Sequence, residues 1–389
     1  MLRVFVNGRV LGDDGIESGL AVLVEDGRIV AVTDAGDARL AQAQHHDLGG
    51  RLLLPGFIDT QVNGGGGVLF NDAPELDSLR RIASAHARYG TTGLLPTLIS
   101  DDLDTMRRAV TAVDTAIAAG MPGILGIHLE GPFLSLERRG VHDPAKIRAI
   151  DAQGVDLASS LKRGKTLLTL APERTTPEVI RELSARGVIV AAGHTTATHE
   201  QMRIALDSGV RGFTHLFNAM TPLQSREPGT VGAALDDAAS WCGLIVDGHH
   251  VHPATLRIAI RAKARGKMML VTDAMPPVGA DDPTFRLGGE LVTCRDGICL
   301  TPAGVLAGSC LDMAGAVRNT VQLLGLPLAE VARMASTYPA AFLGLEATHG
   351  RIAAGCRADL VVADGDIQVH ETWIGGERVF GDGMTAPQQ

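Results

Sequence analysis

Hydrophobic and polar residues alternate at both ends of the chain in the manner of β-strands. Apolar-rich runs occupy residues 2–10 and 20–24, and Asp26-Gly27 is a hairpin signal leading into residues 28–32. Residues 359–363 and 371–374 repeat the pattern near the C-terminus, with Gly375-Gly376 as the turn. We therefore expect one small β-sandwich domain assembled from residues 1–51 and 347–389.

The middle of the chain, residues 52–346, alternates between apolar runs and amphipathic stretches, which is typical of α/β folds with a parallel sheet. Residues 198–208 illustrate an expected helix, because Thr198 suits the N-cap and Gly209 the end. Eight such units in about 220 residues fit a (β/α)₈ TIM-type barrel. The alternative is an open doubly wound sheet, but no Gly-rich dinucleotide fingerprint follows the first strand. The strand candidates are residues 52–59, 92–98, 123–130, 166–172, 188–194, 212–217, 242–247 and 267–273.

Polar residues close six of these apolar runs. The carboxyl ends of all strands in such a barrel face one mouth, where catalytic residues collect. Side chains more than two hundred positions apart are therefore expected to meet in one small space. The residues are Asp59, Glu130, His194, His215, Asp247 and Asp273.

Two imidazoles and one carboxylate in this set predict a metal site. Glu130, His194 and His215 form a ligand set that suits a catalytic Zn²⁺ with one position open for water. Each residue alone is weak evidence, since a single histidine at a strand end is usually structural. His128 lies two residues before Glu130 on the same face, and we expect it to support the ligands or pack in the core.

Two aspartates complete the expected chemistry. Asp273 is placed to take a proton from a water activated by the metal and to pass it to a leaving amine. A role as helix N-cap is disfavoured for Asp273, because Pro276-Pro277 follow at once. Asp59 fits the role of a metal ligand and that of a structural anchor equally well.

Composition and charge narrow the class of protein. The chain has 389 residues, is 45% hydrophobic and carries a formal net charge of −9, with no basic run. A large core is expected, and a nucleic-acid partner is not. The apolar runs are too short for a membrane span or a signal peptide, so we expect a cytoplasmic protein. The five cysteines are odd in number and lack CxxC spacing, which predicts neither a disulfide framework nor a zinc–thiolate site.

The same residues also carry a resemblance that covers nearly the whole chain. The motifs PGFIDTQVNG, GIHLEGPF, GHTTAT, THLFNAM, REPG, DGHHV and VTDAM occur in this order, followed by GRIAAGCRADLVV. The chain thereby resembles the N-acetylglucosamine-6-phosphate deacetylase family of the amidohydrolase superfamily. The resemblance implies a (β/α)₈ barrel with a small β domain, a homodimer, and hydrolysis of the acetamide of N-acetyl-D-glucosamine 6-phosphate.

One departure from the wider superfamily concerns the metal. Most members carry an HxH pair after the first strand, but this chain has Gln61 and Asn63 there, which are poor zinc ligands. The bridging lysine of the superfamily is also missing, and Glu130 takes its place. We therefore expect one divalent ion, Zn²⁺ with Fe²⁺, Co²⁺ or Mn²⁺ as alternatives. Asp59, Gln61 and Asn63 remain candidate neighbours of the metal site.

The resemblance also assigns roles to individual positions. It implies metal ligation by Glu130, His194 and His215, and an acid–base role for Asp273. His142 resembles the histidine beside the scissile amide, where it would polarise the carbonyl. Arg226 resembles a phosphate contact that reaches across the dimer interface. The other implied substrate contacts are Val141, Asn218, Ala219, His250, Leu306, Ala307 and Gly308.

Three alternatives stay open. The first is the other epimer of the substrate, because N-acetylgalactosamine 6-phosphate carries the same amide and phosphate. Another N-acyl compound is a second alternative. A catalytically inactive barrel that serves as a scaffold is a third, although this chain retains all three expected ligands and Asp273.

Overall fold

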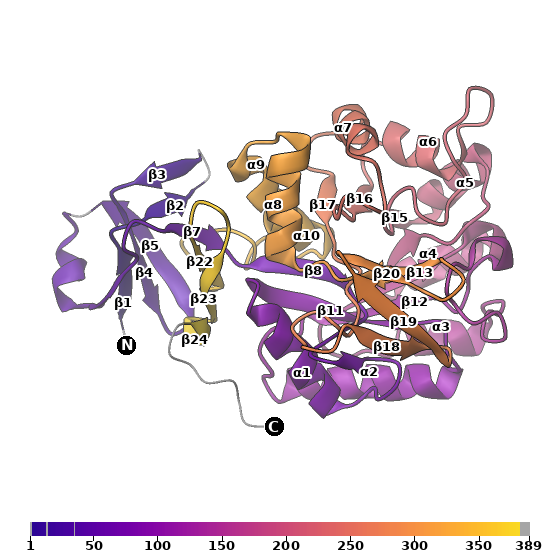
Figure 1. Cartoon of the computed structure of the whole chain (residues 1–389), viewed down its shortest axis with the longest axis horizontal. Helices are drawn as coiled ribbons and strands as arrows, with labels where there is room; N and C mark the ends of the chain where they lie inside the picture. Colours follow the sequence, from indigo (N-terminus) through magenta and orange to yellow (C-terminus); the bar gives the residue numbers. More distant parts are fainter. Residues whose placement is uncertain (1, 13–14, 35, 382–389) are drawn as a thin grey trace.

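A computed structural model describes residues 2–12, 15–34 and 36–381, which form two lobes (Figure 1). The larger lobe contains an eight-stranded sheet in the order β17-β16-β15-β14-β13-β12-β11-β8, in which neighbouring strands run parallel. The strands are β8 (Phe57–Val62), β11 (Thr91–Ile99), β12 (Gly126–Glu130), β13 (Lys165–Leu170), β14 (Ile189–Ala192), β15 (Val210–Phe213), β16 (Trp241–Leu244) and β17 (Met268–Leu270).

One α-helix lies in each chain segment between successive strands of this sheet. They are α1 (Leu76–Ala87), α2 (Leu103–Ala118), α3 (Ala152–Ala158), α4 (Pro177–Ala185), α5 (His199–Ser208), α6 (Gly229–Asp236) and α7 (Pro253–Ala262). Helices α8 (Met313–Leu324), α9 (Leu328–Ala335) and α10 (Thr337–Phe342) follow β17. Helix α5 begins as expected, because Thr198 and Gln201 form a capping box and Gly209 caps the other end.

The two edge strands of the sheet are β8 and β17, and the carboxyl end of β8 meets the residues just beyond β17. The Asp273 N–H donates to Gln61 O at 3.0 Å, and the Asn63 N–H donates to Ala274 O at 2.9 Å. Val62 and Ala274 form an isolated parallel bridge. The sheet is thus closed at the mouth, which confirms the TIM-type barrel.

The smaller lobe combines both ends of the chain, as expected. One sheet has the order β5-β4-β1-β6, and the other has the order β24-β23-β22-β7-β2-β3. Phe5, Val22, Leu53 and Trp373, from both sheets, share one buried cluster, so the lobe is a sandwich. The strands are β1 (Arg3–Val6), β2 (Arg9–Leu11), β3 (Ile16–Ser18), β4 (Leu20–Glu25), β5 (Arg28–Asp34), β6 (Gln44–Asp47), β7 (Leu52–Pro55), β22 (Leu360–Ala363), β23 (Val369–Ile374) and β24 (Glu377–Gly381).

The first strand expected for the barrel, residues 52–59, is in fact two strands. β7 pairs with β2 and β22 in the terminal sheet, whereas β8 pairs with β11 in the barrel. Gly56 separates them, and a Cβ built there would lie 2.0 Å from Thr92 Oγ1. The division into two domains at residues 52 and 346 stays a prediction.

A four-stranded antiparallel sheet lies across the barrel mouth and was not expected from the sequence. It comprises β18 (Thr284–Leu287), β19 (Glu290–Arg295), β20 (Ile298–Leu300) and β21 (Leu306–Ser309). Cys294 and Cys299 are direct partners across β19 and β20 and form a disulfide. The cysteine count and spacing predicted no disulfide framework and did not reveal this single bond, because hairpin pairing brings together cysteines whose spacing carries no signal.

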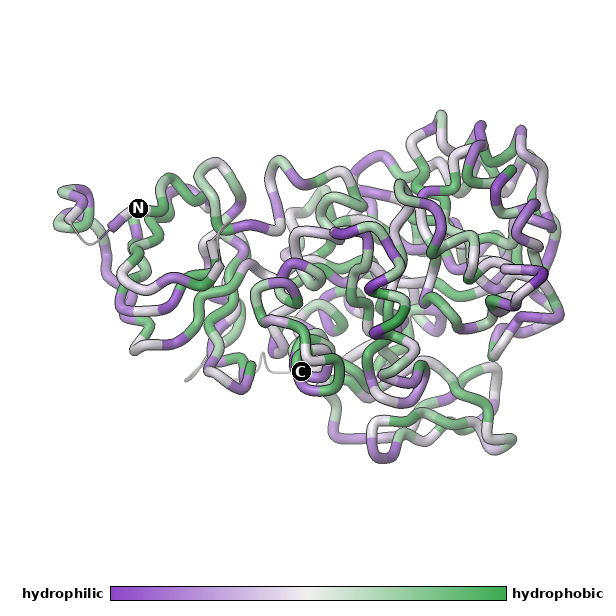
Figure 2. Tube along the Cα trace, turned by 90° about the horizontal axis from the view of Figure 1, so that it is seen from above, coloured by the Kyte–Doolittle hydropathy of each residue, from purple (hydrophilic) through white to green (hydrophobic). Residues whose placement is uncertain are grey.

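The distribution of hydropathy follows this architecture. Figure 2 shows hydrophobic segments within both lobes and hydrophilic segments at many of the outer turns. Within the described parts of the chain, no helix combines the length and apolar character that a membrane crossing requires.

Candidate metal and active site

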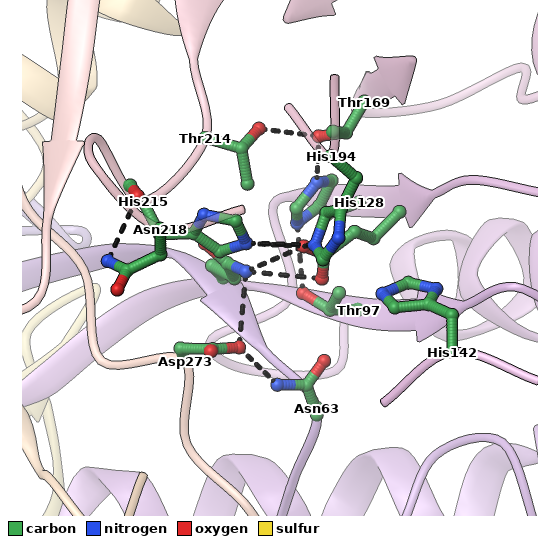
Figure 3. A network of polar contacts seen from close by, with 12 residues as sticks. Asn63, Thr97, His128, His142, Thr169, His194, Thr214, His215, Asn218 and Asp273 are labelled. Carbon is green, nitrogen blue, oxygen red and sulfur yellow. Dashed lines mark hydrogen bonds and ion pairs between the residues drawn. The ribbon is translucent and has the colours of Figure 1, made fainter. Parts of the chain in front are cut away.

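Three of the expected side chains converge at the barrel mouth (Figure 3). Glu130 ends β12, and His194 and His215 lie two residues beyond β14 and β15. Glu130 Oε1 lies 3.1 Å from His194 Nε2 and 3.0 Å from His215 Nε2, and the two Nε2 atoms are 3.1 Å apart. Together the three residues can hold one metal ion.

Hydrogen bonding prepares His194 for this role. His194 Nδ1 lies 2.8 Å from the carbonyl oxygen of Arg138, to which it can only donate. The proton is therefore on Nδ1, and the lone pair of Nε2 points at Glu130 and His215. Metal-ligating histidines usually have such a partner on their second nitrogen. Among the described residues, His215 Nδ1 has none.

The backbone at the site is strained. His194, His215 and Asp273 have φ values of 48°, 34° and 54°, in the left-handed region that residues with a Cβ avoid. Such conformations cost about 1–3 kcal/mol each and persist only where the surroundings enforce them. Each of the three residues lies just beyond the end of a barrel strand, where the turn aims its side chain into the mouth.

The carboxyl groups of the buried Glu130 and the half-buried Asp273 differ in their electrostatics. Burial opposes ionisation of Glu130, but the rings of His194 and His215 next to its Oε1 outweigh it and hold the pKa of Glu130 well below its usual value. Burial, and then the charge of Glu130, raise the pKa of Asp273 to about 6. Glu130 is thus a charged candidate ligand, and Asp273 is suited to exchange a proton near neutral pH.

Gln61 and Asn63 bind the two carboxylates instead of extending the ligand set. Asn63 Nδ2 donates to Asp273 Oδ1 at 2.6 Å, and Gln61 Nε2 donates to the same oxygen at 3.1 Å. Gln61 Nε2 is also 3.1 Å from Glu130 Oε2. The amides therefore fix Asp273 relative to Glu130.

Asp59 is placed as an anchor. Its carboxylate accepts hydrogen bonds from Thr272 Oγ1 at 2.5 Å and from the Gln61 N–H at 3.1 Å. It lies outside the group of Glu130, His194 and His215. Asp59 instead ties β8 to the residue that precedes Asp273.

Two further histidines flank the three ligand candidates. The Ser100 N–H donates to His142 Nδ1 at 3.2 Å, which leaves the ring proton on Nε2. Burial and the neighbouring His194 lower the pKa of His142 to about 3, so the ring is a neutral donor. His128 is buried between Thr97 and Thr169, with Nε2 2.8 Å from Thr169 Oγ1. Its position supports the strand that carries Glu130.

A cavity of about 360 Å³ opens onto the site and gathers most of the expected substrate contacts. Ala307 is buried behind the cavity, and the exposed Arg226 does not line it. The expected residues that line it are Asn63, Glu130, Val141, His142, His194, His215, Asn218, Ala219, His250, Asp273, Leu306 and Gly308.

His250 is fixed by an aspartate at the same mouth. His250 Nδ1 lies 2.5 Å from Asp247 Oδ2, and the N–H groups of His249 and His250 donate to Asp247 Oδ1. Burial opposes ionisation of Asp247, but the His250 ring outweighs it and lowers the pKa of Asp247. The pair presents His250 to the cavity.

Other cavity residues were missed by the sequence reasoning. Ile99, Met275, Leu287 and Val305 line the cavity on its apolar side. Leu287 belongs to the unexpected sheet and Val305 directly precedes its strand β21. The hairpin signals Gly288-Gly289 and Asp296-Gly297 were available to find this sheet. Ser100, which orients His142, carries no signal in the sequence.

Comparison with known proteins identifies the family. The model of the Amidohydrolase family matches residues 52–379. An N-acetylgalactosamine-6-phosphate deacetylase of Shewanella sp. (strain ANA-3) is 44% identical, covering 96% of this chain and 94% of the relative. The human N-acetylglucosamine-6-phosphate deacetylase is 38% identical, covering 97% of this chain and 94% of the relative.

Solved structures agree with this result. The crystal structure of N-acetylglucosamine-6-phosphate deacetylase from Pasteurella multocida superposes with a TM-score of 0.94 at 36% identity, covering 97% of this chain and 99% of that one. The barrel, the group of three candidate metal ligands and the relatives all indicate the same class of hydrolase. The chain belongs to the amidohydrolase family, in the branch of the N-acetylglucosamine- and N-acetylgalactosamine-6-phosphate deacetylases.

Proposed function

We propose that this protein hydrolyses the acetamide of N-acetyl-D-glucosamine 6-phosphate to D-glucosamine 6-phosphate and acetate, in the recycling of amino sugars. The observation that carries the proposal is Asp273, a half-buried carboxyl group beside the candidate ligands and on the wall of the cavity. Relatives of 34–44% identity bear the names of such deacetylases.

The residues present fit a single divalent ion. Three buried donor atoms of Glu130, His194 and His215 converge, and His194 already has its lone pair on the converging side. Gln61 and Asn63 offer amides rather than imidazoles, which favours one ion over two. Zn²⁺ suits this donor set, and when bound it would acidify a water and polarise the acetyl carbonyl.

The chain's own residues would move the protons. Asp273 takes a proton from the water that attacks the acetyl carbonyl, and His142 donates from Nε2 to the oxygen that becomes negative. Asp273 then gives its proton to the departing amine. Asn63 and Gln61 keep the accepting oxygen of Asp273 in place throughout.

Recognition of the phosphate would fall to the residues that follow β15 and β16. Asn218 and Ala219 line the cavity, and Ala219 has a φ of 51°, which turns the backbone sharply there. His250 supplies a ring whose Nδ1 is paired with Asp247. Arg226 lies outside the cavity of its own chain. We therefore propose that the protein is a homodimer in which Arg226 of one copy contacts the phosphate bound to the other. We also propose that the protein is cytoplasmic.

N-acetylgalactosamine 6-phosphate is a second candidate substrate. Relatives named for this epimer reach 44% and 40% identity, against 38% for the human N-acetylglucosamine-6-phosphate deacetylase. The two sugars differ only at C4, whereas the proposed amide and phosphate contacts are common to both.

The test is turnover of both epimeric sugar phosphates and of unphosphorylated N-acetylglucosamine, with metal analysis of the same preparation. We expect about one divalent ion per chain and release of acetate from a phosphorylated sugar at a far higher kcat/KM than from the free sugar. Release from the galactosamine epimer alone would replace the first candidate by the second. No release from any N-acyl sugar would overturn the proposal.

A further inference from the structure

Three cysteines meet in the sheet that covers the barrel mouth. Cys294 and Cys299 form the disulfide across β19 and β20, and Cys310 follows β21 directly. The Sγ atom of Cys310 lies 3.1 Å from that of Cys299. A disulfide bond is about 2.05 Å long, so a displacement of about 1 Å would join these two sulfurs.

The cysteine cluster lies directly behind the substrate cavity. Cys294 and Cys299 are buried, and they share one apolar cluster with Leu69, Met275, Leu287 and Ala307. Met275 and Leu287 also line the cavity, so the same side chains contact both sites. A change in the sulfur bonding is therefore next to the cavity wall.

We propose that Cys294, Cys299 and Cys310 form a thiol–disulfide exchange site. Cys310 loses its proton, and its thiolate attacks Sγ of Cys299. The Cys299–Cys310 bond forms as the Cys294–Cys299 bond breaks, and Cys294 leaves as a thiolate that takes up a proton. One thiol and one disulfide stand on each side, so no oxidant or reductant is consumed.

Burial of Cys310 lowers the rate of this exchange. It raises the pKa of Cys310 to about 11, so that only a small fraction of this thiol is ionised at neutral pH. Since the thiolate is the attacking species, the exchange is slow compared with that of an exposed thiol. Proximity of the two sulfurs offsets part of this disadvantage.

The strand next to Cys310 connects the exchange to the active site. The Ser309 N–H donates to Asp273 O, and the Met275 N–H donates to Ser309 O, both at 2.9 Å. Leu306 and Gly308 of the same strand line the cavity. Drawing Cys310 toward β20 therefore moves the strand that closes the cavity, and substrate binding should change more than the chemical step.

A peptide map reads the bonding directly. Trypsin cleaves after Arg286, Arg295 and Arg318, which puts Cys294 in one peptide and both Cys299 and Cys310 in the next. The native protein is incubated at neutral pH, quenched with acid, alkylated under denaturing conditions and digested without reduction. A Cys294–Cys299 bond joins two peptides, whereas a Cys299–Cys310 bond closes a loop within one.

We expect both species from the native chain, the two-peptide species alone from Cys310→Ser, and the loop alone from Cys294→Ser oxidised with glutathione disulfide. The native chain needs no substitution, so the test does not depend on the folding of a variant. Absence of the loop from both the native chain and folded Cys294→Ser would overturn the proposal.

The link to substrate binding rests on the proposed function and has its own measurement. Oxidised Cys294→Ser should differ several-fold in KM from the same variant reduced with a phosphine, with a smaller change in kcat. The double variant Cys294→Ser/Cys310→Ser keeps Cys299 alone of the three cysteines and should show no difference between the two treatments. An equal KM in both forms would overturn the link, whereas lack of any deacetylation by the native chain would overturn the proposed function and leave the peptide map intact.

Discussion

Asp273 is held by amides rather than by a cation. Asn63 and Gln61 both donate to its Oδ1, while burial and Glu130 favour its protonated form. A carboxyl group in this balance can accept a proton and release it within one turnover. Its neighbours fix its position without fixing its charge.

Replacement of Asp273 separates catalysis from metal binding. Asp273→Asn keeps the shape of the side chain but removes its basicity, and we expect kcat to fall by at least about a hundredfold. Metal content should stay unchanged, because Glu130, His194 and His215 are intact. The measurement is acetate release alongside metal analysis, with Asp281→Asn at an exposed position as control. Loss of metal together with activity would make Asp273 a ligand.

Asp59 gives a prediction on stability and pH. Burial raises its pKa to about 7, against hydrogen bonds from Thr272 and the Gln61 N–H, whereas an aspartate in the unfolded chain has a pKa of about 3.9. The folded form binds the proton more tightly, so the stability that Asp59 contributes is full below about pH 4 and lost as pH rises through 7.

Asp59→Asn abolishes this titration. The free energy of unfolding of the native chain, relative to that of the variant, should therefore fall from pH 5 to pH 8, by at most about 3 kcal/mol. Urea unfolding at several pH values measures it. Asp281→Asn should show little such trend, and a difference that rises with pH would contradict the assignment.

At the scale of elements, strand β12 combines a structural and a functional constraint. Gly126 begins β12, and a Cβ built there would lie 1.9 Å from Lys165 O on β13. The same strand ends at Glu130, so its position sets that of a proposed ligand. Close packing of the backbone in this part of the barrel thus bears on the metal site.

Gly126→Ala should therefore lower both the stability of the barrel and the affinity of the proposed metal site. The methyl group pushes β12 away from β13, which we expect to cost about 3 kcal/mol of unfolding free energy. Metal affinity should fall as well, because Glu130 moves with the strand. Thermal unfolding and metal titration measure the two effects. Gly365→Ala is the matched control, since nothing lies within 4 Å of a Cβ built there.

The sequence predicted the elements that local turn chemistry or the repeated strand–helix pattern determines. It missed a sheet and a disulfide that lie outside this pattern. The terminal hairpin at Asp26-Gly27 and helix α5 are confirmed, because local turn and capping chemistry determines them. The convergence of Glu130, His194 and His215 is confirmed because it follows from the parallel arrangement of the strands. The sheet β18–β21 and the disulfide between Cys294 and Cys299 were missed, since both depend on pairing across hairpins inserted into the barrel pattern.

At the scale of the whole molecule, the described part of one chain holds the candidate ligands, Asp273 and a cavity, but leaves Arg226 outside it. An exposed arginine that contacts substrate must either move or come from another copy. A closed dimer with two-fold symmetry would supply it twice, once to each cavity. The prediction is a homodimer in solution, measured by light scattering after gel filtration.

Complementation between two defective chains distinguishes an Arg226 that acts on the cavity of the other chain from one that acts within its own chain. Arg226→Ala should raise KM and Asp273→Asn should remove turnover, so each variant alone is weak at low substrate concentration. In a mixed dimer, the cavity of the Arg226→Ala chain keeps its own Asp273 and receives Arg226 from the other chain. Random exchange would then restore about a quarter of the native sites. If Arg226 instead acted within its own chain, the mixture would show only the average of the two separate activities, because no cavity would have both residues.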